Sequence, residues 1–267
     1  MATILRLSFF FILAICINSN AFPQYRKFAA QEAKLAKIYS KMLSFHHVNG
    51  DSIEFYSQKF ERELKSFLQN SPGTLNYPFK KLNDDSSFCS IETSGDGKFR
   101  IYSWDDWTGG SMRYYKELYQ WKGSRNVFMR IPRYEGGSEG DGFLCSDIFT
   151  VLIDKKAYYL AVKNSVASGR DRVYSISAYR IDGDKLLDSV KLFKTKTEML
   201  NTIDVYVDLG KPYERDDFIS YDPRLKIVYI PCVNGENALT NKNLLYQLKG
   251  RYFTYIGVET GKRRSTK

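Results

Sequence analysis

The stretch GDGKFRIYSWDDWTGGSMRYYKELYQWKG, residues 95–123, contains all three tryptophans of the chain and two clear turn signals. The first signal is Asp96-Gly97, a residue pair that accepts positive φ, and strand-forming residues lie on both sides of it, in 88–93 and 98–104. The second signal is the run 105–110, which interrupts the strand pattern before it resumes at 112–121. The sequence therefore predicts a β-hairpin at 88–104 and a third strand after the second turn.

The strand at 98–104 has two different faces. Because side chains alternate along a strand, Phe99 and Ile101 point to one side, whereas Arg100, Tyr102 and Trp104 point to the other. The second face is too aromatic for an ordinary solvent-exposed surface. We expect it to contact either other parts of the protein or a ligand.

Aromatic rings and carboxylates are concentrated in and after the second turn. Flat rings cover the apolar CH face of a sugar, and carboxylates accept hydrogen bonds from its hydroxyl groups. The alternative is that these rings close the end of a β core, which is the commoner use of large aromatic side chains beside a turn. If the rings gather around one loop, the predicted ligand-binding residues are Trp104, Asp105, Asp106, Trp107, Tyr115, Tyr119 and Trp121.

The N-terminus, residues 1–21, is typical of a secretory signal. Arg6 is its one basic residue, an apolar run follows at 7–17, and small residues precede the expected cleavage point after Ala21. The run is too short for an ordinary membrane-spanning helix, and no later segment is suited to span a bilayer. We expect an exported protein, periplasmic or extracellular, with no transmembrane segment after signal removal. Lipid attachment at Cys16 is the alternative, although Ile15 stands where a lipoprotein signal normally has a small residue.

The formal net charge of the chain is +10, and removal of residues 1–21 takes away only Arg6, which leaves +9. A basic protein outside the cytoplasm suits an anionic cell-envelope polymer, a glycan or another envelope protein. Nucleic acid is not an expected partner for an exported protein. Positive charge also keeps a protein soluble without any anionic partner.

Residues 22–72 are expected to form a helical hairpin. Apolar residues recur at three- and four-residue steps in 23–46 and again in 51–70, which predicts two amphipathic helices. Gly50 is expected to separate them, and Asp51 to cap the second helix with Glu54. Residues 73–87 are polar and turn-rich and are predicted to be a linker.

Residues 88–260 are expected to form an antiparallel β domain, because short strand patterns follow one another with no helical pattern between them. Asp182-Gly183 and Lys249-Gly250 are further hairpin signals. The fold class is therefore α+β: an N-terminal α-helical hairpin followed by a mainly antiparallel all-β domain, propeller-like or alternatively a β-sandwich. The tail at 261–267 is basic and predicted to be disordered.

Three cysteines remain after signal removal. In an oxidising compartment Cys89 and Cys145 are the most plausible disulfide pair, with Cys232 left over, although three thiols are equally compatible with the sequence. Their spacing matches no zinc motif, and we expect no metal and no cofactor.

The loop at 135–141 carries the remaining chemical signals. Its G-x-S-x-G pattern at 136–140 is followed by no helix, so we interpret it as a loop and not as a nucleophile elbow. Its carboxylates do not have the spacing of an EF-hand, and calcium binding is a minor alternative. Asp105 or Asp106, paired with Glu135, Glu139 or Asp141, would have the residue types of a glycoside hydrolase.

We expect an exported binding or interaction protein, not an enzyme, that contacts a glycan or a cell-envelope polymer. The alternatives are a glycan-active hydrolase that uses these carboxylates, and a structural envelope protein that docks through its helical hairpin.

Overall fold

The computed structural model describes residues 21–46, 48–83, 89–132, 142–211 and 218–261. Two long helices come first, α2 (Ala21–Ser44) and α3 (Gly50–Gln69), and the short 3₁₀ helix η1 (Pro72–Asn76) follows them. The remaining elements of the described chain are strands: β1 (Cys89–Thr93), β2 (Phe99–Asp105), β3 (Tyr115–Lys122), β4 (Val127–Arg130), β5 (Leu144–Ile153), β6 (Lys156–Val166), β7 (Asp171–Asp182), β8 (Lys185–Leu187), β9 (Phe193–Lys194), β10 (Met199–Leu200), β11 (Thr202–Asp208), β12 (Ser220–Asp222), β13 (Ile227–Val233), β14 (Leu239–Lys249) and β15 (Tyr252–Thr260).

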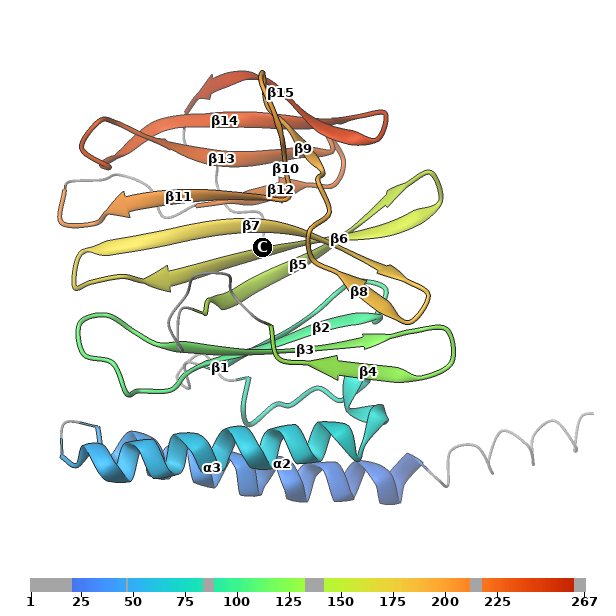
Figure 1. Cartoon of the computed structure of the whole chain (residues 1–267), viewed down its shortest axis with the longest axis vertical. Coiled ribbons are helices and arrows are strands. Elements are labelled where there is room, and N and C mark those ends of the chain that lie inside the picture. The colour runs from blue at the N-terminus through green and yellow to red at the C-terminus, as the bar shows by residue number, and fades with distance from the viewer. Residues whose placement is uncertain (1–20, 47, 84–88, 133–141, 212–217, 262–267) are drawn as a thin grey trace, which may run out of the picture.

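The strands form three sheets, which stack on one another and on the helical hairpin as four layers (Figure 1). The first sheet has the order β1-β2-β3-β4, and the second β11-β7-β6-β5 with β8 attached to β7. The third has the order β10-β9-β15-β14-β13-β12, and the pairing of β15 with β9 is its parallel one. The predicted α+β fold, a helical hairpin followed by a mainly antiparallel β region, is confirmed. At each interface two sheets pack face to face, as in the β-sandwich that was the alternative to a propeller. A third sheet extends this stack.

The helical hairpin forms because both helices have one apolar stripe. Leu35 and Met42 of α2 and Phe60 and Leu64 of α3 are all buried in the core that the hairpin shares with the first sheet. The predicted cap of the second helix was wrong. Asn49, not Asp51, is the N-cap residue: its side chain accepts a hydrogen bond from the backbone N–H of residue 52 at 3.0 Å, because the helix begins already at Gly50.

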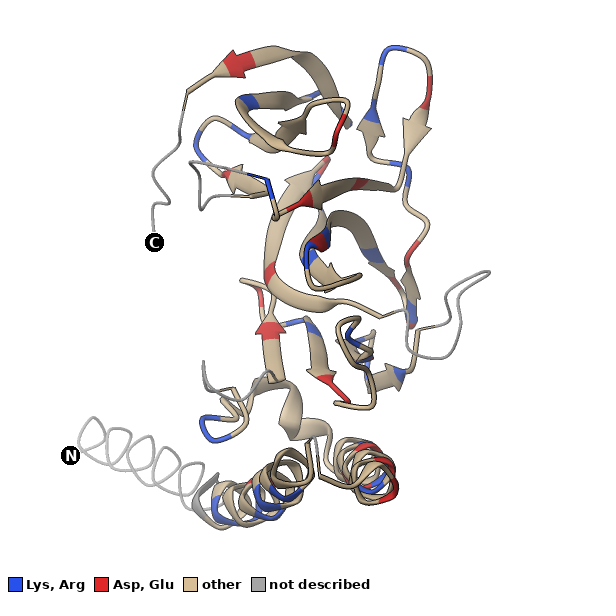
Figure 2. Cartoon of the chain, turned by 90° about the vertical axis from the view of Figure 1, so that its left-hand side faces the viewer, with Lys and Arg blue, Asp and Glu red and all other residues tan. Residues whose placement is uncertain are grey.

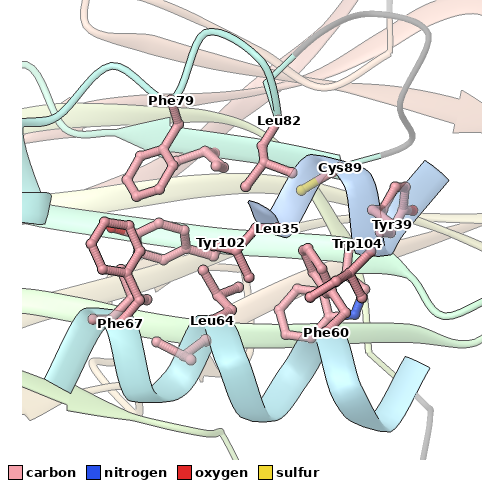
Figure 3. Close-up of a cluster of buried hydrophobic side chains, with 14 of the residues drawn as sticks. Leu35, Tyr39, Phe60, Leu64, Phe67, Phe79, Leu82, Cys89, Tyr102 and Trp104 are labelled. Atoms are coloured by element: carbon pink, nitrogen blue, oxygen red, sulfur yellow. The ribbon is translucent and has the colours of Figure 1, made fainter. Parts of the chain in front are cut away.

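The first sheet is buried on both faces. Phe99 and Ile101 of β2 lie in the core shared with the second sheet, whereas Tyr102 and Trp104 lie in the core shared with the helices (Figure 3). Every residue of β2 is buried. The expectation that the aromatic face of this strand is not an ordinary solvent surface is confirmed, and the helices are what covers it.

The segment between α3 and β1, predicted as a linker, contributes side chains to the same core. Tyr77, Phe79 and Leu82 are buried there, and Figure 3 shows Phe79 and Leu82 above the helices. Phe79 packs edge-on against Phe67 of α3 and Tyr102 of β2. This segment therefore joins the helices to the first sheet by direct packing, whereas its role as a domain boundary stays a prediction.

The second sheet also packs on both faces. One face meets the first sheet through a core that includes Tyr159 and Tyr179. The other meets the third sheet, where Val162 and Ile176 lie in one core with Phe253. Three hydrophobic cores therefore separate the four layers.

The predicted hairpin turns are confirmed. Gly97, Gly183 and Gly250 have φ values of 68°, 60° and 59°, in the left-handed region that glycine adopts without a steric penalty. They connect β1 to β2, β7 to β8 and β14 to β15. The local turn chemistry of the sequence thus sets the register of these three hairpins.

Of the two alternatives for the cysteines, the structure agrees with thiols and not with a Cys89–Cys145 disulfide. Cys89 lies in the core between the helices and the first sheet, and Cys145 lies in the core on the opposite side of that sheet. The strands of the first sheet therefore separate the two sulfur atoms.

Some predictions fall outside the described residues. These are the secretory signal with Cys16, the loop at 135–141 with its G-x-S-x-G pattern and carboxylates, and the basic tail after residue 261. Within the described part of the chain, no helix combines the length and the apolar character that crossing a bilayer requires.

Candidate functional site

The seven residues predicted to bind a ligand are all buried, and none exposes more than 8% of its surface. They do not form one group. Trp104 and Trp107 belong to the core between the helices and the first sheet, whereas Tyr119 and Trp121 belong to the core between the first and second sheets. Asp105, Asp106 and Tyr115 lie at the end of the β2–β3 pair, where Asp105 is opposite Tyr115. The structure thus divides the predicted site between two faces of one sheet.

Trp107 is held in place at this end of the sheet by α2 and by its own loop. Its backbone has a φ of 59°, an uncommon conformation for a bulky residue. Its N–H donates to Asp105 Oδ1 at 2.8 Å, and its indole N–H donates to the Tyr39 hydroxyl of α2 at 3.2 Å. The Arg113 guanidinium lies 4.5 Å from the centre of the ring, and the His46 ring is also 4.5 Å away. Trp107 therefore links the first sheet to the C-terminal end of α2.

The two carboxylates of the turn bond mainly to the turn itself. Asp105 also lies 3.5 Å from Arg113, and burial raises the pKa of its carboxyl group to about 6. Asp106 accepts hydrogen bonds from the N–H and the hydroxyl of Thr108, at 2.9 Å and 2.6 Å, and lies 3.9 Å from Lys116. These contacts stabilise the loop conformation that carries Trp107.

The other aromatic residues of the predicted site pack inside the molecule. Trp104 meets the ring of Phe60 edge-on at 5.4 Å, and Figure 3 shows the two side chains together above α3. Trp121 donates its indole N–H to the backbone carbonyl of Asp184 at 3.0 Å and stacks on Phe128. These contacts agree with the alternative that large rings close the β core. A ligand-binding role for the seven residues stays a prediction.

A buried ionic cluster lies between the first and second sheets, and the sequence reading missed it. Lys163 Nζ lies 3.0 Å from Glu117 Oε1 and donates to the Tyr119 hydroxyl at 2.7 Å, and that hydroxyl lies 3.1 Å from the Tyr179 hydroxyl. Burial is the largest single influence and lowers the pKa of Lys163, but the surrounding acidic groups, first among them Glu117, together outweigh burial and hold the pKa well above its usual value. Strand alternation could have placed each of these residues on an inner face, but only the packing of the first sheet against the second brings side chains of β3, β6 and β7 together.

The helix α2 presents the strongest exposed charge pattern in the helical layer. Between Pro23 and Ser44 its only acidic residue, Glu32, is buried, while all of its basic residues are exposed. Figure 2, which looks along the helices, shows basic positions on α2 and positions of both signs on α3. The exposed basic residues, called here the α2 basic face, are Arg26, Lys27, Lys34, Lys37 and Lys41.

The spacing of this face follows from the helix. Lys27, Lys34 and Lys41 are seven residues apart, so they lie on one side of α2 at intervals of about 10 Å, over a length of about 21 Å. Lys34 forms an ion pair with Glu63 of α3 at 2.8 Å. In the described part of the structure, no ion pair involves the other four residues. The predicted amphipathic pattern of this helix already requires a polar outer side, and the burial of Glu32 is what the structure adds.

A metal site has no support in the described residues, where no three histidine, cysteine, aspartate or glutamate side chains form a cluster that could hold an ion. Residues 135, 139 and 141, which would complete the carboxylate pairs predicted for a hydrolase, lie outside the described part of the chain.

The chain matches no protein-family model, and a search of curated proteins found no significantly similar sequence.

Proposed function

We propose that this protein is an exported, non-catalytic binding protein and that the α2 basic face attaches it to an anionic cell-envelope polymer. The single observation that carries the proposal is the separation of charge on α2. Five exposed cations stand on one helix, and the only carboxylate of that helix is turned into the core. The proposal combines two expectations from the sequence: an envelope polymer as the partner, and the helical hairpin as the element that docks.

The spacing of the cations favours an extended partner. Successive lysines about 10 Å apart are separated by roughly one Debye length at physiological salt, so they repel one another only weakly and act together on a linear chain of negative charges. Such a partner neutralises several cations at once and releases its own counterions, a gain that a small anion does not provide. A repeating anionic polymer therefore fits the α2 basic face better than a small ligand does.

The hydrolase alternative receives less support from the geometry of the turn. Asp105 and Asp106 are buried, and each accepts a hydrogen bond from the backbone of its own loop. Both carboxylates already stabilise the turn through these hydrogen bonds. This favours a structural role for them over a catalytic one. The raised pKa of Asp105 follows first from burial and needs no substrate to explain it.

The proposal is tested by binding of a polyanion at several salt concentrations. Inorganic polyphosphate and poly-glutamate are suitable probes, because they share the linear charge and differ in the charged group. The test variant Arg26→Gln/Lys27→Gln/Lys37→Gln removes three exposed charges that have no ion-pair partner in the described structure. We expect wild-type binding to weaken linearly on a double-logarithmic salt plot, and the variant to lower the slope by roughly 2 to 3.

The matched control is Lys156→Gln/Lys191→Gln/Lys249→Gln, which removes three exposed lysines from the second and third sheets and their connection. It changes the net charge by the same amount and leaves the α2 basic face intact. Equal loss of binding in the two triple variants would show that the protein responds to net charge alone. That result, or the absence of any polyanion binding by the wild type, would refute the proposal.

A further inference from the structure

The buried residue Glu32 connects α2 to a second basic element. Its carboxylate accepts a hydrogen bond from the Tyr77 hydroxyl at 2.6 Å and from the backbone N–H of Leu82 at 3.2 Å, and it also accepts one from the backbone N–H of Lys81. Only 2% of Glu32 is exposed. The turn that contains Lys80 and Lys81 is therefore fastened to the side of α2 through its backbone, which leaves both lysine side chains exposed.

The surface of α2 between this turn and the α2 basic face consists mostly of small residues, with Tyr25, which packs against Tyr77, at its N-terminal end. At 100° per residue, Ala36, Ala29 and Ala33 follow Glu32 around the helix in that order, and Arg26 and Lys37 come next. All three alanines are partly exposed. Arg26 and Lys37 border this strip of small side chains on one side, and the turn with Lys80 and Lys81 borders it on the other.

We propose that the Lys80–Lys81 turn is the second edge of the polymer-binding site and that Glu32 is the positioning residue that holds it there. The polyanion lies along the alanine strip, with Lys80 and Lys81 on one side and Arg26 and Lys37 on the other. This inference rests on the proposed function and adds to it a two-edged site and a role for the buried carboxylate of α2.

Tyr77 supports the same arrangement. Its ring packs edge-on against Phe28 of α2 at 5.6 Å, so the segment before the turn is fixed to the helix by apolar contact as well. Burial and the hydrogen bond to Glu32 raise the pKa of the Tyr77 hydroxyl well above its usual value, so the hydroxyl stays a donor at every physiological pH. The segment is thus attached to α2 in two ways, by the Tyr77–Phe28 ring contact and by the hydrogen bonds to Glu32. Only the second attachment holds the backbone of the turn at Lys81 itself.

The first test is the variant Lys80→Gln/Lys81→Gln, which changes two exposed side chains and no described side-chain contact. Polyphosphate binding is measured at several salt concentrations, with Lys156→Gln/Lys249→Gln as the matched control. We expect the salt slope of the turn variant to fall by roughly 1 to 2, and that of the control to stay at the wild-type value. A turn variant that binds as the control does would overturn the inference.

The second test is Glu32→Gln. Two explanations predict opposite changes in its affinity for the polyanion. Removal of a negative charge strengthens polyanion binding if only net charge matters, whereas loss of the positioning contact weakens it. We expect weaker binding, and we expect Lys80→Gln/Lys81→Gln to cause no further loss when added to Glu32→Gln. Tighter binding, or losses that simply add, would contradict a positioning role. Circular dichroism and the melting temperature check that each variant keeps the wild-type fold.

The outcomes separate this inference from the proposed function. If the wild type binds no polyanion, the proposed function fails. If the wild type binds and Arg26→Gln/Lys27→Gln/Lys37→Gln weakens binding but the turn variant does not, the function stands and the two-edged site is wrong.

Discussion

The substitution Lys163→Met tests how the first and second sheets are held together. It removes the cation that lies 3.0 Å from Glu117 and the donor to the Tyr119 hydroxyl, and it leaves a side chain of similar length. The side chains of Lys163 and Glu117 expose only 3% and 0% of their surface. Water therefore cannot replace the lost partner, and Glu117 must either remain an isolated buried ion or take up a proton.

The expected cost is large. Breaking a buried ion pair by removing one partner costs about 3–5 kcal/mol. For a chain of this size, 1 kcal/mol corresponds to a shift of about 2–4 °C in the melting temperature, so Lys163→Met is expected to lower it by roughly 6 to 20 °C. Burial raises the pKa of Glu117, and in the variant no cation opposes that effect. The loss should therefore be greater at pH 8 than at pH 5, because the carboxyl group is protonated more easily at the lower pH.

The assay is denaturant unfolding of matched variants at both pH values. Glu117→Gln/Lys163→Met removes both charges with little change in volume, and we expect it to recover more than half of the loss. The control is Lys34→Met, which breaks the exposed pair with Glu63 and should cost less than about 1 kcal/mol. A cost below about 1 kcal/mol for Lys163→Met, or a double variant as unstable as the sum of its single changes, would refute the account of this cluster.

Three further predictions concern single features of the fold. Burial raises the pKa of Glu92 to about 7, so ionisation of this carboxyl group destabilises the fold as the pH rises from about 4.5 through 7. Glu92→Gln should therefore raise the melting temperature at pH 8 and have little effect at pH 4. An equal effect at the two pH values would contradict this. Asn49→Ala should cost about 1 kcal/mol of unfolding free energy, and Asp51→Ala less, because Asn49 is the cap; the reverse order in urea unfolding would show otherwise. Cys89 and Cys145 are buried and burial raises the pKa of both thiols, so a thiol reagent should label them only after unfolding; rapid labelling of the native protein would disprove their burial.

Much of the fold could be predicted from the sequence because it depends on local chemistry. The apolar stripes at helical spacing gave both helices, and the glycine turns at 97, 183 and 250 gave three hairpins. The error at the cap of α3 was also local, since Asn49 and Asp51 lie two residues apart and both are residue types that cap helices. How the sheets stack depends on contacts between distant strands, and no short pattern encodes that.

The candidate site shows the same division. The clustering of aromatic residues in 95–123 was visible in the sequence, but their burial was not, because α2 and α3, which cover Trp104, lie in an earlier and separate part of the chain. Strand alternation correctly separated the two faces of β2. It could not show that Trp107 lies on the face covered by the helices and Tyr119 on the face covered by the second sheet. The outer side of α2 follows from its predicted amphipathic pattern, whereas the hydrogen bond from Leu82 to Glu32 joins residues about 50 positions apart.

The most direct test of the proposed attachment is lysine acetylation of the purified protein with and without inorganic polyphosphate, read by peptide mass spectrometry. All lysines compared are exposed in the structure, so their reactivities can be compared within one sample. The account predicts that polyphosphate protects Lys37, Lys80 and Lys81, which border the alanine strip, more strongly than Lys27 and Lys41, which lie further around α2. The lysines of the second and third sheets, such as Lys156 and Lys249, should react as before. Protection that is equal across the molecule, or concentrated on those two sheets, would contradict the α2 basic face as the site of attachment.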